Sequence, residues 1–132
     1  LAHCIKPGGY AALQIITLRE ADFDNYRGTV DFIQKYVFPG GMLPPPSALA
    51  NEARRVGLED IDANMFGEDY AETLHRWHAD FNAAWPRIRE LGFDERFARI
   101  WRYYLAYCEA GFRSGRCDVG QFVYRKPATA LS

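Results

Sequence analysis

Hydrophobic residues first dominate the chain at residues 10–18, YAALQIITL. A nearly continuous run of aliphatic and β-branched residues is typical of a strand buried on both faces. The KPGG stretch before it predicts the end of a short helix, because proline cannot continue a helix and glycine readily adopts a turn with positive φ. A strand that follows a helix through such a turn is half of an α/β repeat.

Helical spacing of apolar positions, three or four residues apart, appears further along the chain. It predicts a short apolar face from Phe32 to Val37 and two longer helices over residues 69–91 and 94–115. Pro86 lies inside the first long helix and is expected to kink or restart it.

The stretch FPGGMLPPP, residues 38–46, separates this short apolar face from a further helix. Two glycines and four prolines in nine residues exclude a helix or a central strand and predict a stiff turn. The helix after it, over residues 48–56, would be capped by Ser47 and ended by Gly57.

Two more strands complete the pattern. Residues 58–67 have a mixed pattern, whereas residues 117–126 alternate and predict a half-exposed edge strand. The order of elements predicts the last third of an open α/β sheet with helices inserted between its final strands. Ligands of such sheets bind at the carboxyl ends of strands, here near Ile16 and Thr17.

Composition supports a single globular domain, since 48% of the 132 residues are apolar and 15% are aromatic. A net charge of −1 provides no basic field for nucleic acid. No apolar run approaches the ~20 residues of a membrane span, and there is no starting Met, so we expect a soluble piece of a longer protein. The three cysteines, Cys4, Cys108 and Cys117, are odd in number and unpaired in spacing, which fits a reducing compartment.

One group of residues has the spacing of metal ligands. Glu72, His75 and His78 recur every three residues, and a Glu-x-x-His step can serve a di-metal site. Such a site needs a second step of the same kind, which the sequence lacks. A solvated polar face is the favoured interpretation, and no metal is expected.

Four blocks, in order, carry a family resemblance: IKPGGYAALQIITL, DFIQKYVFPGGMLP, FGEDYAETLHRWHADFNAAWPRI and DERFARIWRYYLAYCEAGFRSG. Together they resemble the C-terminal half of the cyclopropane-fatty-acyl-phospholipid synthases, the mycolic acid cyclopropane synthase family. The resemblance implies the C-terminal part of a class I S-adenosylmethionine-dependent methyltransferase (Rossmann-like) sheet with inserted cap helices. Residues 1–132 would then be the C-terminal portion of one catalytic domain, with the cap within residues 70–115.

The same resemblance implies a reaction. Members of this family transfer the sulfonium methyl of S-adenosylmethionine to the cis double bond of a phospholipid acyl chain, and a bound bicarbonate ion accepts the proton lost on ring closure. The glycine-rich cofactor loop would lie upstream, so this chain alone is expected to be inactive. The implied location is cytoplasmic, peripheral to the inner face of the membrane, with unsaturated phospholipid as partner. Homo-oligomerisation or association with the missing N-terminal half is also expected, because a truncated parallel sheet would expose a strand edge.

The family's bicarbonate site maps onto three residues. Tyr70, in GEDY, matches the tyrosine that hydrogen-bonds the anion, and Ile16 matches an isoleucine that contributes through its main chain. Gln14 is a departure, because many members have histidine there. A glutamine amide can donate a hydrogen bond to an anion but cannot shuttle a proton.

The proline-rich stretch matches the family's loop at the acyl tunnel. Phe38 would present an aromatic wall near the reacting bond, where its quadrupole could stabilise a cation. Without the resemblance, Phe38, Tyr70 and Ile16 would be read as core or ordinary surface residues, and the aromatic stripe of residues 101–107 as core packing.

Two alternatives to lipid cyclopropanation stay open. One is a small-molecule amine N-methyltransferase built on the same scaffold. The other is a lipid-binding or interaction module that keeps the cap and has lost catalysis, a view that the glutamine at position 14 permits.

Overall fold

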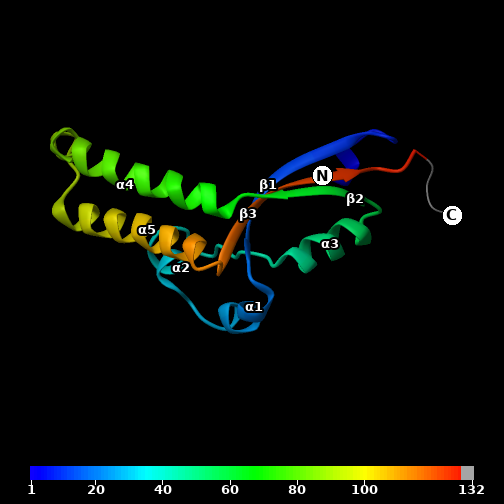
Figure 1. Ribbon diagram of the computed structural model, residues 1–132, viewed down its shortest axis with the longest axis horizontal. Helices are drawn as coiled ribbons and strands as arrows, with labels where there is room; N and C mark the ends of the chain where they lie inside the picture. The colour runs from blue at the N-terminus through cyan, green and yellow to red at the C-terminus, as the bar shows by residue number, and fades with distance from the viewer. Residues whose placement is uncertain (129–132) are drawn as a thin grey trace.

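The computed structural model describes residues 1–128, which form one three-stranded sheet and five α-helices (Figure 1). A long helical hairpin extends from one end of the sheet, and a shorter helix lies toward the other end. In chain order the elements are a 3-10 turn Ala2–Cys4, β1 Tyr10–Leu18, α1 Glu20–Arg27, α2 Phe32–Tyr36, α3 Pro46–Arg55, β2 Glu59–Met65, α4 Gly67–Glu90, α5 Glu95–Arg113 and β3 Cys117–Arg125. No helix among the described residues is long and apolar enough to cross a membrane.

The strand order is β1-β3-β2, and β3 pairs antiparallel with both neighbours. The prediction that β3 is an edge strand was therefore wrong. Its polar residues face polar residues on the flanking strands instead of solvent alone: Gln121 Nε2 donates to Gln14 Oε1 at 3.4 Å, and Arg125 Nε donates to Glu59 Oε2 at 2.9 Å. Because its polar side chains pair with those of neighbouring strands, a central strand can show the same alternation of apolar and polar residues as an edge strand.

The first strand also differs from its prediction. β1 was expected to be buried on both faces, yet Tyr10, Ala12 and Gln14 are exposed and only Thr17 and Leu18 are fully buried. Its pairing within the described sheet is with β3 alone and is antiparallel, whereas the sequence-based prediction assumed a parallel sheet. Only the carboxyl end of this strand is enclosed, and that end is where the helices gather.

The two faces of the sheet carry separate apolar clusters. One face packs against the helical hairpin through a cluster that includes Leu74, Leu105, Phe112 and Val119. The opposite face packs against α3 through a second cluster, whose buried members are Ile5, Ala53, Leu58, Phe122 and Tyr124. The register places Ile16 opposite Val119, so this part of β1 lies on the hairpin side.

Proline and serine act differently from expectation in the helices. The helix α4 runs without interruption through Pro86 to Glu90, so the proline does not restart it. Ser47 does not cap α3, because Pro46 already occupies the first helical position. Instead Glu20 of α1 accepts hydrogen bonds from the Ser47 backbone N–H at 2.9 Å and its hydroxyl at 2.8 Å, which joins α1 to the start of α3.

Candidate functional site

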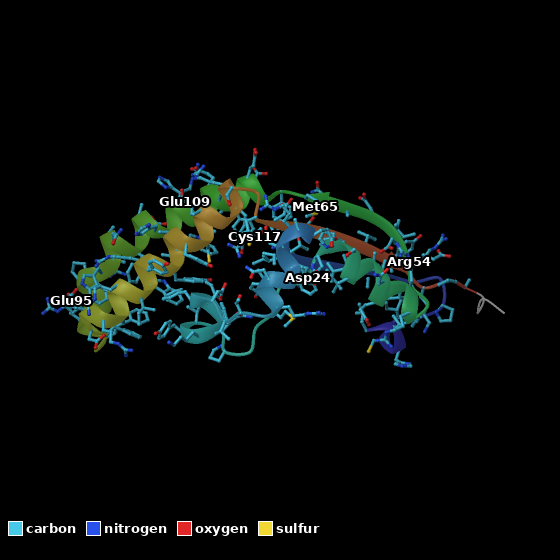
Figure 2. The ribbon with its side chains drawn as sticks, turned by 90° about the horizontal axis from the view of Figure 1, so that it is seen from below. Asp24, Arg54, Met65, Glu95, Glu109 and Cys117 are labelled. Carbon is cyan, nitrogen blue, oxygen red and sulfur yellow. The ribbon has the colours of Figure 1, made fainter. Side chains whose placement is uncertain are left out.

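A cavity of about 690 Å³ lies where the carboxyl end of β1 meets α2, the proline-rich loop and α5. This volume is within the range of sites that enclose small-molecule ligands. Its wall is formed mainly by apolar and aromatic side chains, among them Ile16, Leu18, Ile33, Phe38, Met42, Leu43, Tyr104, Tyr107, Cys108, Phe112 and Cys117. In Figure 2, Cys117 marks the start of β3, at the junction with the end of α5.

The proline-rich loop is held in place by hydrogen bonds at both ends. Asp31 and Gln34 form a reciprocal capping box at the start of α2, and Gln34 Nε2 donates to the Gly41 carbonyl oxygen at 2.9 Å. At the far end, the Leu43 backbone N–H donates to the Tyr26 hydroxyl at 3.2 Å. Gly40 has a φ of +79°, a conformation that favours glycine. The loop is thus a fixed turn that closes one side of the cavity.

Phe38 stands at the beginning of this turn and lines the cavity. Its ring packs edge-on against Tyr104 of α5, with 6.4 Å between centroids. The side chain is 56% exposed, so it does not belong to the buried core. A large aromatic ring that is held rigidly yet remains exposed is suited to contact with a ligand.

Polar groups in the cavity are few and are mostly engaged. The Asp31 carboxylate accepts from the Gln34 backbone N–H at 2.9 Å and from the Tyr107 hydroxyl at 3.4 Å. Burial, together with this nearby carboxylate, raises the pKa of Tyr107. The cavity therefore offers a mainly apolar environment with one hydrogen-bonded acid, Asp31, and one cation, Arg116, in its lining.

The thiols and the phenol in the wall are held in their neutral forms. Burial raises the pKa of Cys108 to about 12 and that of Tyr104 to about 12. Burial also raises the pKa of Cys117. Near neutral pH none of the three carries charge, since an apolar environment disfavours the ionised form.

Tyr70 lies beside the cavity but is not part of its wall. Its ring packs edge-on against Phe112, with 5.2 Å between centroids, and against Trp77 at 6.3 Å. Phe112 itself lines the cavity, so Tyr70 contacts a residue of the cavity wall. Tyr70 and Ile16 both pack against the same buried cluster under the hairpin.

Gln14 lies further from the cavity. It is exposed, two residues before Ile16 on β1 and hence on the same face of the sheet. Its carbonyl oxygen accepts from Gln121, which leaves the NH₂ group of Gln14 as a donor. The structure thus brings Ile16 and Phe38 to the cavity and Tyr70 next to it, while Gln14 stays on the open part of the sheet.

Two of the three residues with metal-ligand spacing make other contacts. Glu72 accepts from Arg76 Nε at 2.9 Å, and His75 Nδ1 lies 3.3 Å from Glu109. Glu109 also accepts from Arg113 Nε at 2.8 Å. Within the described residues no cluster of three potential ligands could hold a metal ion.

Sequence reasoning missed most of the cavity wall on α5. Tyr104 and Tyr107 were read as core packing. The available signal was the width of the stripe, because α5 carries more aromatic residues than contact with one partner helix requires. Trp101 and Tyr104 both pack on the cluster shared with α4, and Tyr104 and Tyr107 also line the cavity.

Comparison with known proteins places this arrangement in a family. The chain is 45% identical over 123 residues to the tuberculostearic acid methyltransferase of Mycobacterium tuberculosis, covering 92% of this chain and 29% of the relative. It is 35% identical to the cyclopropane-fatty-acyl-phospholipid synthase of Escherichia coli K12, covering 92% of this chain and 30% of the relative. The chain therefore spans less than a third of the length of these relatives.

A solved structure gives the same answer for the fold. A mycolic acid cyclopropane synthase complexed with SAH and CTAB matches with a TM-score of 0.80 and 28% identity, over 89% of this chain and 44% of that one. The α/β fold is accordingly part of a class I S-adenosylmethionine-dependent methyltransferase fold. The family model described as mycolic acid cyclopropane synthetase matches residues 1–122. The chain belongs to the mycolic acid cyclopropane synthetase family.

Proposed function

We propose that the protein transfers the methyl group of S-adenosylmethionine to the cis double bond of an unsaturated phospholipid acyl chain and closes a cyclopropane ring. The observation that carries this proposal is the apolar cavity of about 690 Å³ beside the carboxyl end of β1. Its wall of aliphatic side chains, aromatic rings and neutral thiols suits a hydrocarbon chain. Its position suits a sheet in which ligands bind at the ends of strands.

The alkene is a weak nucleophile, so its reaction depends on alignment and on exclusion of water. Ile16, Leu18 and Phe112 supply apolar surface along one side of the cavity, and the loop that carries Phe38 supplies the other. An acyl chain held between these walls replaces water around the reacting bond. The chain described here thereby acts on the acceptor side of the reaction.

Methyl transfer to an alkene leaves positive charge on carbon. Phe38 and Tyr104 both line the cavity, from two different elements, and an aromatic face stabilises a nearby cation by ~0.5–2 kcal/mol. The proline and glycine residues of the loop fix the position of Phe38, so little reordering is needed during the reaction.

Neutral thiols protect such a cation. A thiolate next to the sulfonium donor or the carbocation would compete with the alkene, because the thiolate is the nucleophilic form of cysteine. The raised pKa values of Cys108 and Cys117 keep both thiols protonated at neutral pH. We therefore propose that the two thiols line the cavity without taking part in the reaction.

A bicarbonate ion held by residues of this chain would supply the base for the proton lost on ring closure. Tyr70 would donate a hydrogen bond from its hydroxyl, Ile16 would contribute through its main chain, and Gln14 would donate from its amide. Support comes from the position of Tyr70 and Ile16 on one buried cluster and from the Gln121 contact that leaves the Gln14 NH₂ available. A carboxylate-like anion near the cation would also stabilise it electrostatically.

S-adenosylmethionine would supply an activated methyl group on a sulfonium centre. Among the described residues, β1 and α1 are joined by Arg19 alone, so this connection contains no glycine-rich loop that could hold the cofactor. We therefore assign no cofactor-binding residue in this chain.

A methyl-branched product is the second candidate, because the relative at 45% identity is named a tuberculostearic acid methyltransferase. Amine acceptors fit less well, since Asp31 is the one carboxylate among the described residues that line the cavity, and it is already hydrogen-bonded. A non-catalytic lipid-binding module would keep the cavity but show no methyl transfer.

The deciding experiment is the fatty-acid profile, by gas chromatography and mass spectrometry, of cells expressing the complete gene product or its Tyr70→Phe variant. Conversion of monounsaturated chains to cyclopropanes, reduced by the variant, supports the reaction and the role of Tyr70. Tyr10→Phe is the matched control, because Tyr10 is exposed at the start of β1. Methylene-branched chains, or methyl-branched chains saturated by a hydride donor of the cell, favour the second candidate. Unchanged lipids from a folded protein that binds S-adenosylmethionine refute the acyl substrate.

A further inference from the structure

A second pocket, of about 290 Å³, lies between α2 and the first turns of α5. It is lined by Phe32 and Tyr36 from α2 and by Arg96, Arg99 and Ile100 from α5. The proposed reaction uses none of these residues. With two arginines beside two aromatic rings, this pocket differs chemically from the apolar cavity.

The cations of this pocket have no acidic partner within the part of the chain described. Among residues 1–128, no carboxylate lies within ion-pair distance of Arg96 or Arg99. Lys35 adds a third positive charge, with Nζ 5.1 Å from the Tyr36 ring centroid.

The acids nearest in sequence make contacts elsewhere. Asp94 Oδ1 accepts from the Phe97 backbone N–H at 2.8 Å, and Glu95 Oε1 accepts from Trp85 Nε1 of α4 at 3.3 Å. The pocket therefore presents net positive charge to an incoming ligand.

The pocket and the apolar cavity share a wall. The Phe32 ring packs against Tyr103 at 4.5 Å and Tyr107 at 6.2 Å between centroids, and Tyr107 lines the cavity. Along α5, Ile100 of the pocket precedes Tyr104 of the cavity by four residues, about one helical turn or ~6 Å. A molecule with an anionic group and an apolar chain could occupy both sites at once.

We propose that the pocket lined by Arg96 and Arg99 binds the phosphate of a glycerophospholipid head group while an acyl chain of the same lipid enters the cavity. This inference rests on the proposed function. Guanidinium groups match phosphate oxygens in bidentate geometry, and Lys35 contributes charge to the anionic surface from which the lipid comes. The aromatic rings of Phe32 and Tyr36 suit the boundary between head groups and hydrocarbon.

The test is flotation of the complete gene product with vesicles of phosphatidylcholine containing phosphatidylglycerol, and with vesicles of phosphatidylcholine alone. Arg96→Gln combined with Arg99→Gln should weaken binding to the anionic vesicles about 30-fold. Each basic residue near such a surface raises the membrane affinity roughly five- to six-fold. Arg96→Lys combined with Arg99→Lys should retain part of the binding, since it keeps the charge and loses the planar fork.

The matched control is Arg54→Gln combined with Arg55→Gln. It removes the same charge from α3, which lies at the opposite end of the molecule from Glu95 and the start of α5 (Figure 2). Both control arginines are exposed, and their surface ion pairs contribute little to stability. Equal loss of vesicle binding in control and pocket variants would overturn the site in favour of general charge.

Further arms separate the source of the phosphate and the nature of the partner. Competition by inorganic phosphate as strong as that by phosphatidylglycerol vesicles would overturn the head-group assignment. The head-group assignment would also be overturned if the pocket variant bound vesicles normally but transferred methyl groups more slowly to acyl chains carried by an acidic protein.

Methyl transfer is measured separately, on lipid dispersed in neutral detergent. Selective loss of vesicle binding in a protein that methylates no lipid supports the pocket and refutes the proposed function. If the pocket variant methylates lipid normally and also binds vesicles as the wild type does, the proposed function is supported and the pocket is refuted.

Discussion

Asp118 ties the start of α4 to β3: its Oδ1 accepts a hydrogen bond from the Gly67 backbone N–H at 2.9 Å, across 51 residues of sequence. The same oxygen accepts from the Val119 backbone N–H at 2.8 Å. A β-carbon on Gly67 would lie 2.5 Å from this oxygen and 3.3 Å from the Asp118 Cα. Glycine at position 67 is thus required by the close approach of the helix to the sheet. This contact fixes the base of the helical hairpin.

Substitution Gly67→Ala should lower the free energy of unfolding by ~1–3 kcal/mol, because the added methyl group forces Asp118 or the helix to move. Urea denaturation of the complete gene product measures the effect. Gly28→Ala is the control, since its nearest atoms would be 3.7 Å away and its φ is −88°. Equal denaturation midpoints for wild type and Gly67→Ala would refute the close-contact argument.

Substitution Phe38→Ala should slow ring formation about 2- to 30-fold and leave the affinity for S-adenosylmethionine unchanged, because it removes an aromatic face worth ~0.5–2 kcal/mol to the cation. Phe38→Tyr keeps that face and should retain most of the rate. The measurements are lipid turnover and calorimetric titration of the cofactor. Phe93→Leu, at the tip of the hairpin, controls for loss of an exposed ring. Full turnover by Phe38→Ala would remove Phe38 from the site.

Alkaline pH should destabilise the protein through Cys108. Its ordinary pKa is 9.0 and burial raises it to about 12 in the folded state, so the unfolded state ionises first as the pH rises. The stabilising contribution is complete below pH 9 and is lost as the pH rises toward 12. Thermal melting against pH measures it, and Cys108→Ala should flatten the slope in this window. An identical slope in the variant would show that Cys108 does not contribute.

The same burial predicts slow alkylation at Cys108 and Cys117. At pH 8 both thiols should react with iodoacetamide more slowly than Cys4, which is exposed. Mass spectrometry of the modified peptides gives the order of reaction. Equal labelling of all three cysteines in the folded protein would contradict the enclosed cavity wall.

Chelation should leave the protein unaltered. Glu72 and Glu109 are already bound to arginines, and the pKa of each is lowered chiefly by that hydrogen bond. We expect the melting temperature to be the same before and after treatment with EDTA. Elemental analysis showing one stoichiometric transition metal per chain would overturn this expectation.

The two long helices could be predicted closely from the sequence, because dense apolar stripes define α4 and α5 over many turns. The helix α1 was not anticipated. Its residues EADFDNYR bury only Tyr26, so no stripe is present, although acidic residues in the first turn and Arg27 in the last are weak helix signals. The central position of β3 was also missed, since lateral pairs of polar residues such as Gln121 with Gln14 are invisible in a single sequence.

The site could be predicted in part. Ile16 and Phe38 were predicted from the family resemblance, and both line the cavity; their roles in the reaction stay predictions. The opposing wall on α5 was not identified, because its aromatic residues serve both as core and as cavity lining. Periodicity shows that a residue faces inward but does not distinguish a packed interior from an enclosed space. That distinction depends on α2 and the loop, which form the rest of the lining beside α5 and are joined to it by the Tyr107–Asp31 hydrogen bond.

The order of the strands has a consequence for biosynthesis. β1 and β2 both pair with β3 and not with each other, and β3 is made last of the three. At a synthesis rate of ~5–20 residues per second, β1 waits several seconds for the segment that gives it a partner within this sheet. During that interval the edge of β1 that later pairs with β3 is open to chaperones and to pairing with the wrong chain.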